Sequence, residues 1–337
     1  MASYLDKLEL QYEVMRHQRG LSVSYNPEQA EMLVGLTTVL TSPEIENTQV
    51  LLMPHTEAPQ LHDFGDMMPL QRLIQLNQSE WLLDMLATDQ FTTHFQPLVY
   101  ANNTSKIYGY EALVRGVDER GDLVMPGALF EAAHSAGVLS QLDLAARRSA
   151  IRGADHHNLD AHLFINFTPV AVYDPVSCLR TTVQAIDQAN IPHDRVVFEV
   201  VESNHPQDLS HLMLILRYYR EAGFLVALDD FGAGSSSLNL LHQLRPDFIK
   251  LDMELIRRVH QDPYKASITE KILEIAQRLA IKTVAEGIES FEELNWVCDR
   301  GVDFVQGYII AKPGNPPVVS TPCLTPSSLP TPSLISA

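Results

Sequence analysis

The chain has 337 residues, of which 45% are hydrophobic and 20% are charged, and its formal net charge at pH 7 is −18. This composition is typical of a soluble globular protein and leaves room for one large domain and a smaller one. The negative charge argues against binding to nucleic-acid polymers or anionic membranes, which need clustered Lys and Arg, but it allows a small phosphate ligand held through metal ions.

Residues 1–77 predict a small, mostly helical region. Helical patterns cover residues 4–19, 26–39 and 68–76, and residues 50–53 have the pattern of a short strand. The region contains no cluster of catalytic side chains. We therefore expect it to be a regulatory or partner-binding region that senses a signal or a protein partner.

From about residue 77 onward, strand and helix patterns take turns. Residues 77–80 resemble a capping box that opens a helix. The predicted strands are 91–97, 108–114, 162–166, 195–199, 224–228, 247–250, 282–286 and 302–306. Serial βα repetition at intervals of roughly 20–35 residues predicts an α/β protein with a (β/α)₈ TIM-like barrel, and a doubly wound sheet is the alternative. The last residues, 314–337, are rich in Pro, Ser and Thr and predict a disordered tail.

Targeting signals are not apparent in the sequence. The three cysteines are scattered without the spacing of a metal site, which predicts reduced thiols (Cys178, Cys298 and Cys323). The N-terminal residues 1–7 are too polar for a signal peptide, and no run of about 18 apolar residues occurs. We expect a cytoplasmic protein without a membrane span.

The stretch 224–238 carries the first indication of chemistry. An apolar run of strand length is followed by Asp229 and Asp230 and then by Gly232 and Gly234. Two adjacent ionised carboxylates repel each other unless a cation offsets the cost, which favours a metal site. Successive side chains of a strand point to opposite faces, so the strand must end or bend between the two for both to serve one site. The alternative is that Asp230 caps a helix and Asp229 is solvated.

The predicted strands share a further property: each of seven ends in a polar residue. These residues are Glu111, Asn166, Glu199, Asp229, Lys250, Glu286 and Gln306. The carboxyl ends of barrel strands converge on one mouth, where catalysis occurs. A ligand set made only of oxygens suits Mg²⁺ or Mn²⁺, and five carboxylates, counting Asp230, suit two ions about 3.5–4 Å apart that activate a water and clamp a phosphoryl group. Lys250 would steady a phosphate or the attacking water.

Several ordered motifs resemble one family. Glu111-Ala-Leu113 within Tyr110–Arg115 resembles the signature of the EAL domain family of cyclic di-GMP phosphodiesterases. The resemblance covers about residues 78–313 and includes Phe95-Gln-Pro97, Phe164–Pro169, Phe198–Ser203, Leu228–Gly232, Ile249-Lys250, Ala285–Glu289 and Gln306-Gly-Tyr308. It implies a modified (β/α)₈ barrel in which one strand is reversed.

The resemblance also implies roles for individual residues. Glu111, Asn166, Glu199 and Asp229 would hold a first metal, and Asp229 would bridge to a second beside Asp230 and Glu286. Lys250 would bind the nucleophilic water or the scissile phosphate, and Glu286 is a candidate general base; Glu111 completes the predicted catalytic group. Substrate contacts would come from Gln96, Arg115, Asp143 and Gln306. Glu202 would tether the loop 232–237, which in the family couples dimer contacts to metal binding.

The favoured hypothesis is therefore a Mg²⁺- or Mn²⁺-dependent enzyme, inhibited by Ca²⁺, that opens cyclic di-GMP to linear pGpG in bacterial second-messenger signalling. The resemblance further implies a homodimer formed through the barrel. The alternative is a catalytically silent receptor that binds the same ligand and passes the signal through residues 1–77. Inactive members of the family usually lack a metal-binding carboxylate, whereas every one is present here. A different metal-dependent barrel enzyme, such as an enolase-type lyase, would leave Gln96 and Gln306 without a role.

Overall fold

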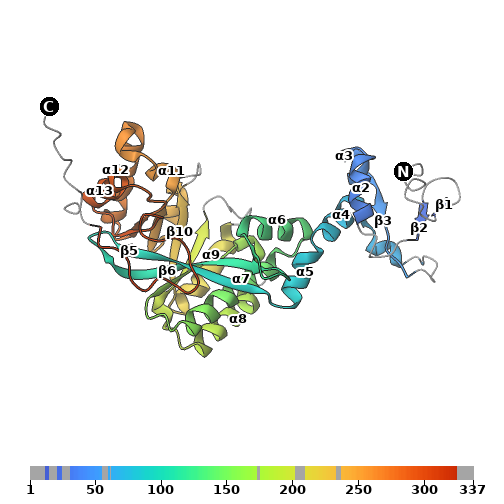
Figure 1. The fold of residues 1–337 in the computed structure, drawn as a ribbon, viewed down its shortest axis with the longest axis horizontal. Helices are drawn as coiled ribbons and strands as arrows, with labels where there is room; N and C mark the ends of the chain where they lie inside the picture. Colours follow the sequence, from blue (N-terminus) through green and yellow to red (C-terminus); the bar gives the residue numbers. More distant parts are fainter. Residues whose placement is uncertain are drawn as a thin grey trace. The chain divides into compact units, whose positions relative to one another are not determined.

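The computed structural model describes residues 12–14, 21–24, 31–54, 60, 62–172, 175–201, 209–232 and 237–324 (Figure 1). The chain divides into two compact units. One consists of residues 1–89 and 127–139, and the other of residues 90–126 and 140–337. Within the described ranges, every helix is too short or too polar to cross a membrane.

The first unit begins with two short antiparallel strands, β1 (Tyr12–Val14) and β2 (Leu21–Val23). The helix predicted for residues 4–19 is therefore wrong where the structure describes this segment. Tyr12 pairs with Val23 and Val14 with Leu21, so aromatic and β-branched side chains oppose each other across a local ladder, which outweighs the helical spacing of the sequence.

A small hydrophobic core joins the elements that follow. These are α2 (Glu31–Gly35), η3 (Leu36–Thr38), α3 (Ser42–Asn47), β3 (Gln49–Val50), η4 (Asp63–Asp66), β4 (Met68–Pro69) and α4 (Leu70–Gln78). Leu33 and Leu36 pack with Leu70, Leu73 and Ile74. The predicted capping box at residues 77–80 is wrong, because α4 continues through Gln78 and the Ser79 side chain makes no cap hydrogen bond.

Two further helices belong to this unit. Helix α5 spans Glu80–Ala87 and buries Leu82 and Met85. Helix α6 (Pro126–Ala136) belongs to the same unit as α5, except for its first residue, Pro126. About 40 residues of sequence separate the two helices. The Ser79 hydroxyl, directly before α5, donates to the Ala132 carbonyl of α6 at 3.3 Å and so links the two helices.

The second unit is a closed barrel of eight strands. In order around the barrel they are β5 (Phe91–Tyr100), β13 (Phe304–Val305), β12 (Lys282–Ala285), β11 (Phe248–Leu251), β10 (Leu225–Phe231), β9 (Val196–Val201), β8 (His162–Asn166) and β6 (Asn103–Val117). Pairing of β5 with β6 closes the circle, and a short β7 (Leu123–Val124) extends β6. Strand β5 is antiparallel to both neighbours while the other barrel pairs are parallel. The expected modified barrel with one reversed strand is confirmed.

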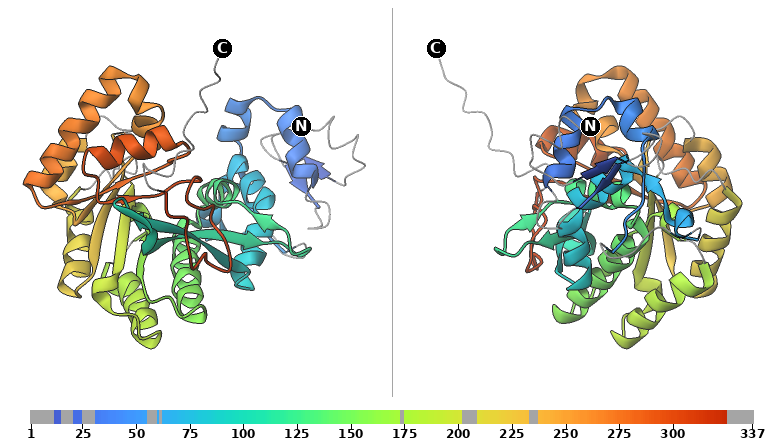
Figure 2. Two further views of the ribbon diagram at one scale, coloured as in Figure 1. Left: turned by 60° about the vertical axis from the view of Figure 1, so that its left-hand side comes forward. Right: turned by 90° about the vertical axis from the view of Figure 1, so that its right-hand side faces the viewer.

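Helices cover the outside of this barrel (Figure 2). They are α7 (Leu139–His156), η5 (Pro169–Ala171), α8 (Pro175–Gln188), η6 (His193–Arg195), α9 (Leu209–Glu221), α10 (Ser237–Leu244), α11 (Met253–Ile256), η7 (Val259–Gln261), α12 (Pro263–Arg278) and α13 (Phe291–Asp299). Phe198 of β9 and Val226 of β10 share a core with Leu212 and Ile215 of α9. The buried strands thus have apolar residues on their outer faces as well as inside, as expected for parallel strands covered on both sides.

A layer of apolar side chains fills the barrel interior. It consists of Leu98, Phe164, Val197, Ala227, Phe248, Val284 and Phe304. Tyr108 stacks between His162 (ring centroids 4.2 Å apart) and Phe304 (4.0 Å). On β6 this layer has Gly109, where a Cβ atom would lie 2.7 Å from the His162 carbonyl oxygen and 3.0 Å from the Phe164 ring. The packed interior therefore requires glycine at this position.

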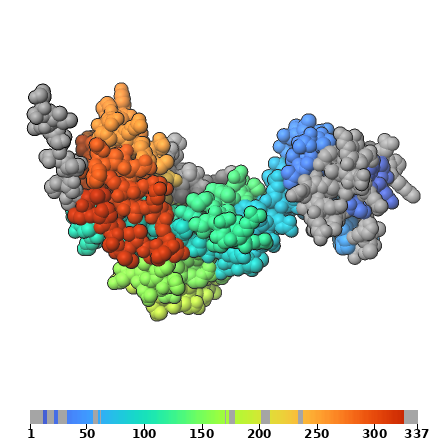
Figure 3. All heavy atoms as spheres, viewed as in Figure 1, coloured from blue at the N-terminus to red at the C-terminus, as the bar shows by residue number. Residues whose placement is uncertain are grey.

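The segment after the last strand lies along the outside of β5 and β6. Gly314 and Phe95 exchange two backbone hydrogen bonds of 2.9 and 3.1 Å, and the Tyr110 hydroxyl donates to the Val318 carbonyl at 2.8 Å. Thr104 accepts from the Leu324 amide at 2.6 Å. Residues 314–324 thus make specific contacts although their composition predicts disorder, and residues 325–337 lie outside the described part. These last described residues, coloured red, form part of the surface of this unit beside the orange residues (Figure 3).

Candidate metal centre

The barrel brings the predicted polar residues together one layer above its apolar interior. Six of them stand two residues beyond a member of that layer, as Asn166 follows Phe164 and Lys250 follows Phe248. Because side chains alternate along a strand, a residue two positions further along points to the same side. Glu111 follows Gly109 in the same way. The prediction that Glu111 ends its strand is wrong, since β6 continues to Val117 and pairs with β5 as far as Gly116.

Lys250 lies at the centre of the cluster. Its Nζ atom is 2.8 Å from Glu199 Oε1, 3.0 Å from Asp229 Oδ1, 2.7 Å from Glu286 Oε1 and 3.6 Å from Glu111 Oε2. Its side chain is only 1% exposed. Burial alone would lower the pKa of this ammonium group, but the four carboxylates raise its pKa well above the usual value. Lys250 is therefore a permanently charged donor in this site.

The carboxylates differ in how strongly they hold protons. Burial raises the pKa values of Glu199, Asp229 and Glu286, and repulsion from neighbouring carboxylates adds to this against the attraction of Lys250. Burial also disfavours the charged form of Glu111, but Lys250 together with hydrogen bonds from Gln306 and Asn166 lowers its pKa overall. One ammonium group thus leaves the negative charge of the cluster incompletely balanced.

Asp230 takes an unusual backbone conformation. Its φ angle is 52°, and the pairing of β10 with β11 shifts register between Leu228 and Phe231. Non-glycine residues rarely adopt this region, and such strain concentrates at functional sites. We expect the strand to end or bend between Asp229 and Asp230 if both are to serve one site, and the bend lies at Asp230 itself. Burial and repulsion from Asp229 raise the pKa of Asp230 to about 6.

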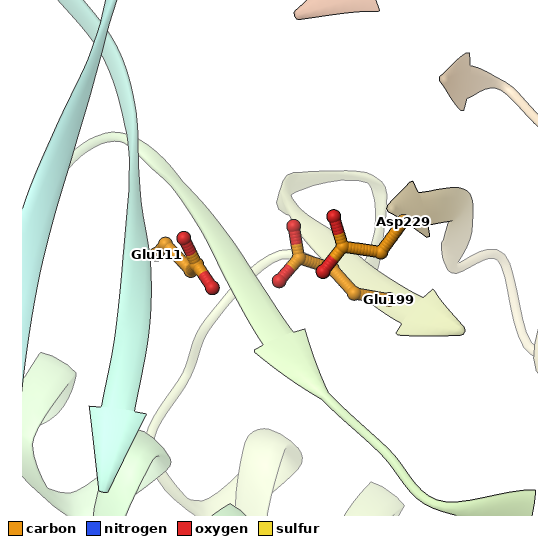
Figure 4. A group of neighbouring side chains, drawn as sticks. All are labelled: Glu111, Glu199 and Asp229. Atoms are coloured by element: carbon orange, nitrogen blue, oxygen red, sulfur yellow. The ribbon is translucent and has the colours of Figure 1, made fainter. Parts of the chain in front are cut away.

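The acidic side chains form two groups with the spacing of metal ligands. Glu111, Glu199 and Asp229 form one, and Asp229, Asp230 and Glu286 form the other, with ligand oxygens within 4.8 Å of one another in each. Figure 4 shows that the carboxylates of the first group point toward one another from three strands. Within the described residues, Glu199 Oε2 is buried without a hydrogen-bond partner. Hard, anionic oxygens with unmet bonding capacity fit divalent cations such as Mg²⁺ or Mn²⁺.

Asn166 and two glutamines border the first group. The Asn166 amide nitrogen donates to Glu111 Oε1 at 3.0 Å. Gln306 Nε2 donates to Glu111 Oε2 at 2.7 Å and to Gln96 Oε1 at 3.1 Å, and Gln96 Nε2 donates to the Ala311 carbonyl at 3.2 Å. Among the described side chains, Gln306 Oε1 is a buried acceptor without a partner. The two glutamines thus lie where they can contact a molecule bound to the carboxylates.

Other predicted site residues have different surroundings. Arg115 is buried further along β6, where its guanidinium donates to the Val114 carbonyl at 2.8 Å. Asp143 is buried in α7, pairs with Arg147 at 2.8 Å and accepts from the Thr168 amide at 2.8 Å, so it contacts the segment after Asn166 rather than the carboxylate cluster. Arg147 was not predicted, although its position four residues after Asp143 is a signal for a helical ion pair. Glu202 lies outside the described residues.

Known proteins are similar to this chain in sequence. Residues 79–313 match the family described as EAL domain. The chain is 31% identical over 228 residues to "Probable cyclic di-GMP phosphodiesterase PdeG" of Escherichia coli, covering 65% of this chain and 44% of that protein. The chain spans less than half the length of the curated relatives it matches.

Solved structures resemble the fold of this chain. A standalone versatile EAL protein from Vibrio cholerae, in its c-di-GMP bound form, has 37% identity and a TM-score of 0.62, covering 69% of this chain and 95% of that one. The manganese/cy-diGMP complex of Klebsiella pneumoniae BlrP1 has 30% identity and a TM-score of 0.61, covering 66% of this chain and 56% of that one.

Proposed function

This chain belongs to the EAL domain family, and on that premise we propose that it is a metal-dependent phosphodiesterase that hydrolyses cyclic di-GMP to linear pGpG. The observation that carries the proposal is the pair of carboxylate groups that share Asp229 around the buried Lys250. Such a shared ligand is what two ions on one phosphodiester require. In a bacterial cell the reaction would remove a second messenger.

We propose that the site takes two ions, Mg²⁺ or Mn²⁺, and the donor set supports a division of the ligands between them. Glu111, Asn166, Glu199 and Asp229 would hold one, and Asp229, Asp230 and Glu286 the other. When bound, the ions lower the pKa of a water and offset negative charge on the phosphoryl oxygens, whereas Ca²⁺, with its larger and looser coordination, would inhibit.

The chain's own side chains would do the remaining work. Lys250 Nζ donates a hydrogen bond to a phosphate oxygen or to the attacking water, and Glu286, whose pKa is raised, accepts the proton of that water. Gln96 and Gln306 orient the substrate beside Glu111, and Arg115 offsets the charge of a phosphate. Asp143 also remains a proposed substrate contact. A dianionic substrate would otherwise be repelled by a protein with a net charge of −18.

Two interactions beyond the substrate are part of the proposal. The chain forms a homodimer through the barrel, which the exposed apolar side chains of Met253, Tyr264 and Ile268 on α11 and α12 support. Residues 1–77 receive a signal or bind a protein partner and regulate the barrel.

The test is hydrolysis of cyclic di-GMP by the purified chain with Mg²⁺, Mn²⁺, Ca²⁺ or a chelator, with products separated by chromatography. We expect pGpG with Mg²⁺ or Mn²⁺ and none with Ca²⁺ or chelator. Binding without turnover in every metal would show a receptor instead.

The matched pair of variants is Glu111→Ala and Glu119→Ala, since Glu119 is an exposed residue of the β6–β7 turn. We expect Glu111→Ala to lose activity by orders of magnitude with an unchanged circular dichroism spectrum, because it removes a ligand from a barrel mouth rather than a core side chain. Glu119→Ala should match wild type. Near-native turnover of Glu111→Ala would rule out the metal assignment.

A further inference from the structure

Glu293 is a buried carboxylate outside the candidate metal centre. It lies in the first turn of α13, and its side chain is almost inaccessible to solvent, at 2% exposure. Both oxygens accept backbone N–H groups: Oε1 from Arg258 at 2.9 Å, and Oε2 from Glu289 at 3.0 Å and Ser290 at 3.2 Å. Carboxylates are rarely buried unless their charge is paired or accepts hydrogen bonds.

The backbone groups that Glu293 binds belong to two different connecting segments, called loops here, the first of which contains the short helix α11. Arg258 lies in the segment after β11, the strand that carries Lys250. Glu289 and Ser290 lie in the segment after β12, which begins with Glu286. Strands β11 and β12 are parallel neighbours, so the segments that follow them start side by side at the barrel mouth. The Glu293 side chain joins these two segments.

Helix capping accounts for only one of the two carboxylate oxygens. The capping box of α13 uses Oε2 and the Ser290 side chain. Oε1 is directed to Arg258, a residue 35 positions away whose φ angle of 53° makes its conformation costly without support. A residue needed only to cap its own helix would not require that second, distant contact.

Other contacts hold the same two loops together next to the catalytic groups. A Cβ atom at Gly287, the residue after Glu286, would lie 2.5 Å from Met253 Cβ, so the loops touch closely at this point. Arg257 donates to Glu289 Oε1 at 2.9 Å as part of a two-point ion pair. The close contact between Lys250 and Glu286 at 2.7 Å thus lies at the base of two loops that Glu293 ties further out.

We propose that Glu293 is a positioning residue that keeps Lys250 and Glu286 in register by joining the loops after β11 and β12. The effect of Glu293 on turnover rests on the proposed function, whereas its role in joining the two loops does not. Loss of the tie would let the two loops separate, and the Lys250–Glu286 pair would spend less time in the arrangement that meets a phosphodiester and a water.

The experiment compares Glu293→Ala and Glu293→Gln with two controls in the full chain. Ser290→Ala removes the reciprocal side-chain cap of α13 but leaves the bond to Arg258, and Glu292→Ala removes an exposed acid from the same turn. Amide hydrogen exchange is measured without metal, and kcat and KM for cyclic di-GMP are measured with Mn²⁺. Calorimetric titration with Mn²⁺ gives the metal affinity separately.

We expect the Arg258 and Glu289 amides to exchange at least about tenfold faster in Glu293→Ala, because each loses a charge-assisted hydrogen bond. The kcat should fall about ten- to a hundredfold with KM within about twofold, and Mn²⁺ should bind about tenfold more weakly. Glu293→Gln keeps one accepting oxygen and should be intermediate. Glu292→Ala should match wild type. Ser290→Ala should keep the slow exchange of the Arg258 amide and the kcat of wild type.

Three outcomes would overturn the proposal. One is unchanged exchange at Arg258 in both Glu293 variants. Another is faster exchange with unchanged kcat and Mn²⁺ affinity, which would make the tie purely structural. The third is an equal loss of kcat in Ser290→Ala. Should wild type itself fail to hydrolyse cyclic di-GMP, the proposed function fails, while exchange and Mn²⁺ binding still decide the role of Glu293.

Discussion

Lys250 brings a positive charge to a position where divalent cations would also act. With its Nζ atom within 3.6 Å of four carboxylates, it holds together side chains that would otherwise repel one another. Removal of one partner from a buried ionic cluster costs about 3–5 kcal/mol, because the remaining charges stay desolvated. The fold of the metal-free protein is therefore expected to depend on this residue.

We predict that Lys250→Met lowers the free energy of unfolding of the metal-free protein by about 3–5 kcal/mol. Mn²⁺ should restore more stability to this variant than it adds to wild type, since the ions replace the missing charge. Thermal denaturation with and without Mn²⁺ measures both effects. Lys282→Met on the neighbouring strand is the control, because its exposed pair with Asp303 is worth less than about 1 kcal/mol. Equal stability of the two variants would contradict the prediction.

His193, the first residue of η6, links stability to pH. Its Nδ1 faces the Ala222 carbonyl at 2.6 Å and its Nε2 faces Asp187 Oδ1 at 2.7 Å, so both nitrogens can donate to these acceptors only when the ring is protonated. Partial burial opposes the charge, but the Ala222 carbonyl and the carboxylates of Asp187 and Asp194 outweigh it and raise the pKa of His193. A raised pKa gives stability that is present below about 6.5, the unfolded value, and is lost as pH rises through the folded value.

We therefore predict that Asp187→Asn destabilises the protein at pH 6 by less than about 1 kcal/mol, because the pair is partly exposed, and has almost no effect at pH 9. Chemical denaturation of both proteins at the two pH values measures the difference. A larger effect at pH 9 than at pH 6 would exclude this role for His193.

At the residue scale, much of the cluster follows from the sequence. Polar residues at strand ends sufficed to predict that Asn166, Glu199 and Glu286 share a mouth with Lys250. The positive φ angle of Asp230 could not be predicted, because it depends on how β10 pairs with β11. The hydrogen bond that Glu293 Oε1 accepts from the Arg258 amide could not be predicted either, since the two residues are 35 positions apart.

Among the elements, the segment 314–324 differs most from the prediction, because its composition predicts disorder. It has no periodicity, and its order comes from partners distant in sequence: a bridge between Gly314 and Phe95, and hydrogen bonds to Tyr110 and Thr104. Local patterns cannot report such partners. The short strands β1 and β2 are a different case, because their pairing is local and overrides a helical spacing. Serial strands and helices of the barrel were predictable because their periodicity is local.

We predict that a chain ending at Pro313 unfolds at a lower temperature than wild type, with a loss of about 2 kcal/mol or more, because several hydrogen bonds of about 0.5–1.5 kcal/mol each disappear and the outer face of β6 is exposed. A chain ending at Leu324 keeps these contacts and should match wild type. Differential scanning calorimetry distinguishes the two. If both truncations leave the Tm unchanged, the segment contributes nothing to stability.

For the molecule as a whole, the boundary between units is not the boundary of the family match. The match begins at residue 79, whereas the first unit continues through Asp89 and includes residues 127–139. Helix α5 therefore matches the family but belongs to the first unit, where Ser79 donates to Ala132 of α6. The predicted domain limit at residue 77 remains a prediction that truncation can test.

We expect a chain starting at Asn77 to stay folded and to hydrolyse cyclic di-GMP, since it keeps α5 and α6 together. A chain starting at Gln90 lacks α5 with its buried Leu82 and Met85. It should lose about 2–5 kcal/mol per large buried side chain removed, enough to unfold α6 or make the protein aggregate. Size-exclusion chromatography, circular dichroism and the hydrolysis assay compare the two. Inactivity of the chain starting at Asn77 would mean that residues 1–76 are integral to the barrel.

The apolar layer with Tyr108 stacked between His162 and Phe304 closes the barrel on the side away from the carboxylates. Within the described residues, this layer fills the way through the barrel, so a molecule that reaches Glu111 and Asp229 through the mouth also leaves through it. Under the proposed function, departing linear dinucleotide and incoming cyclic substrate then share the mouth as their passage. Product that accumulates then obstructs new substrate competitively, and the time needed for product to clear the passage sets a ceiling on turnover however fast the phosphodiester bond is broken.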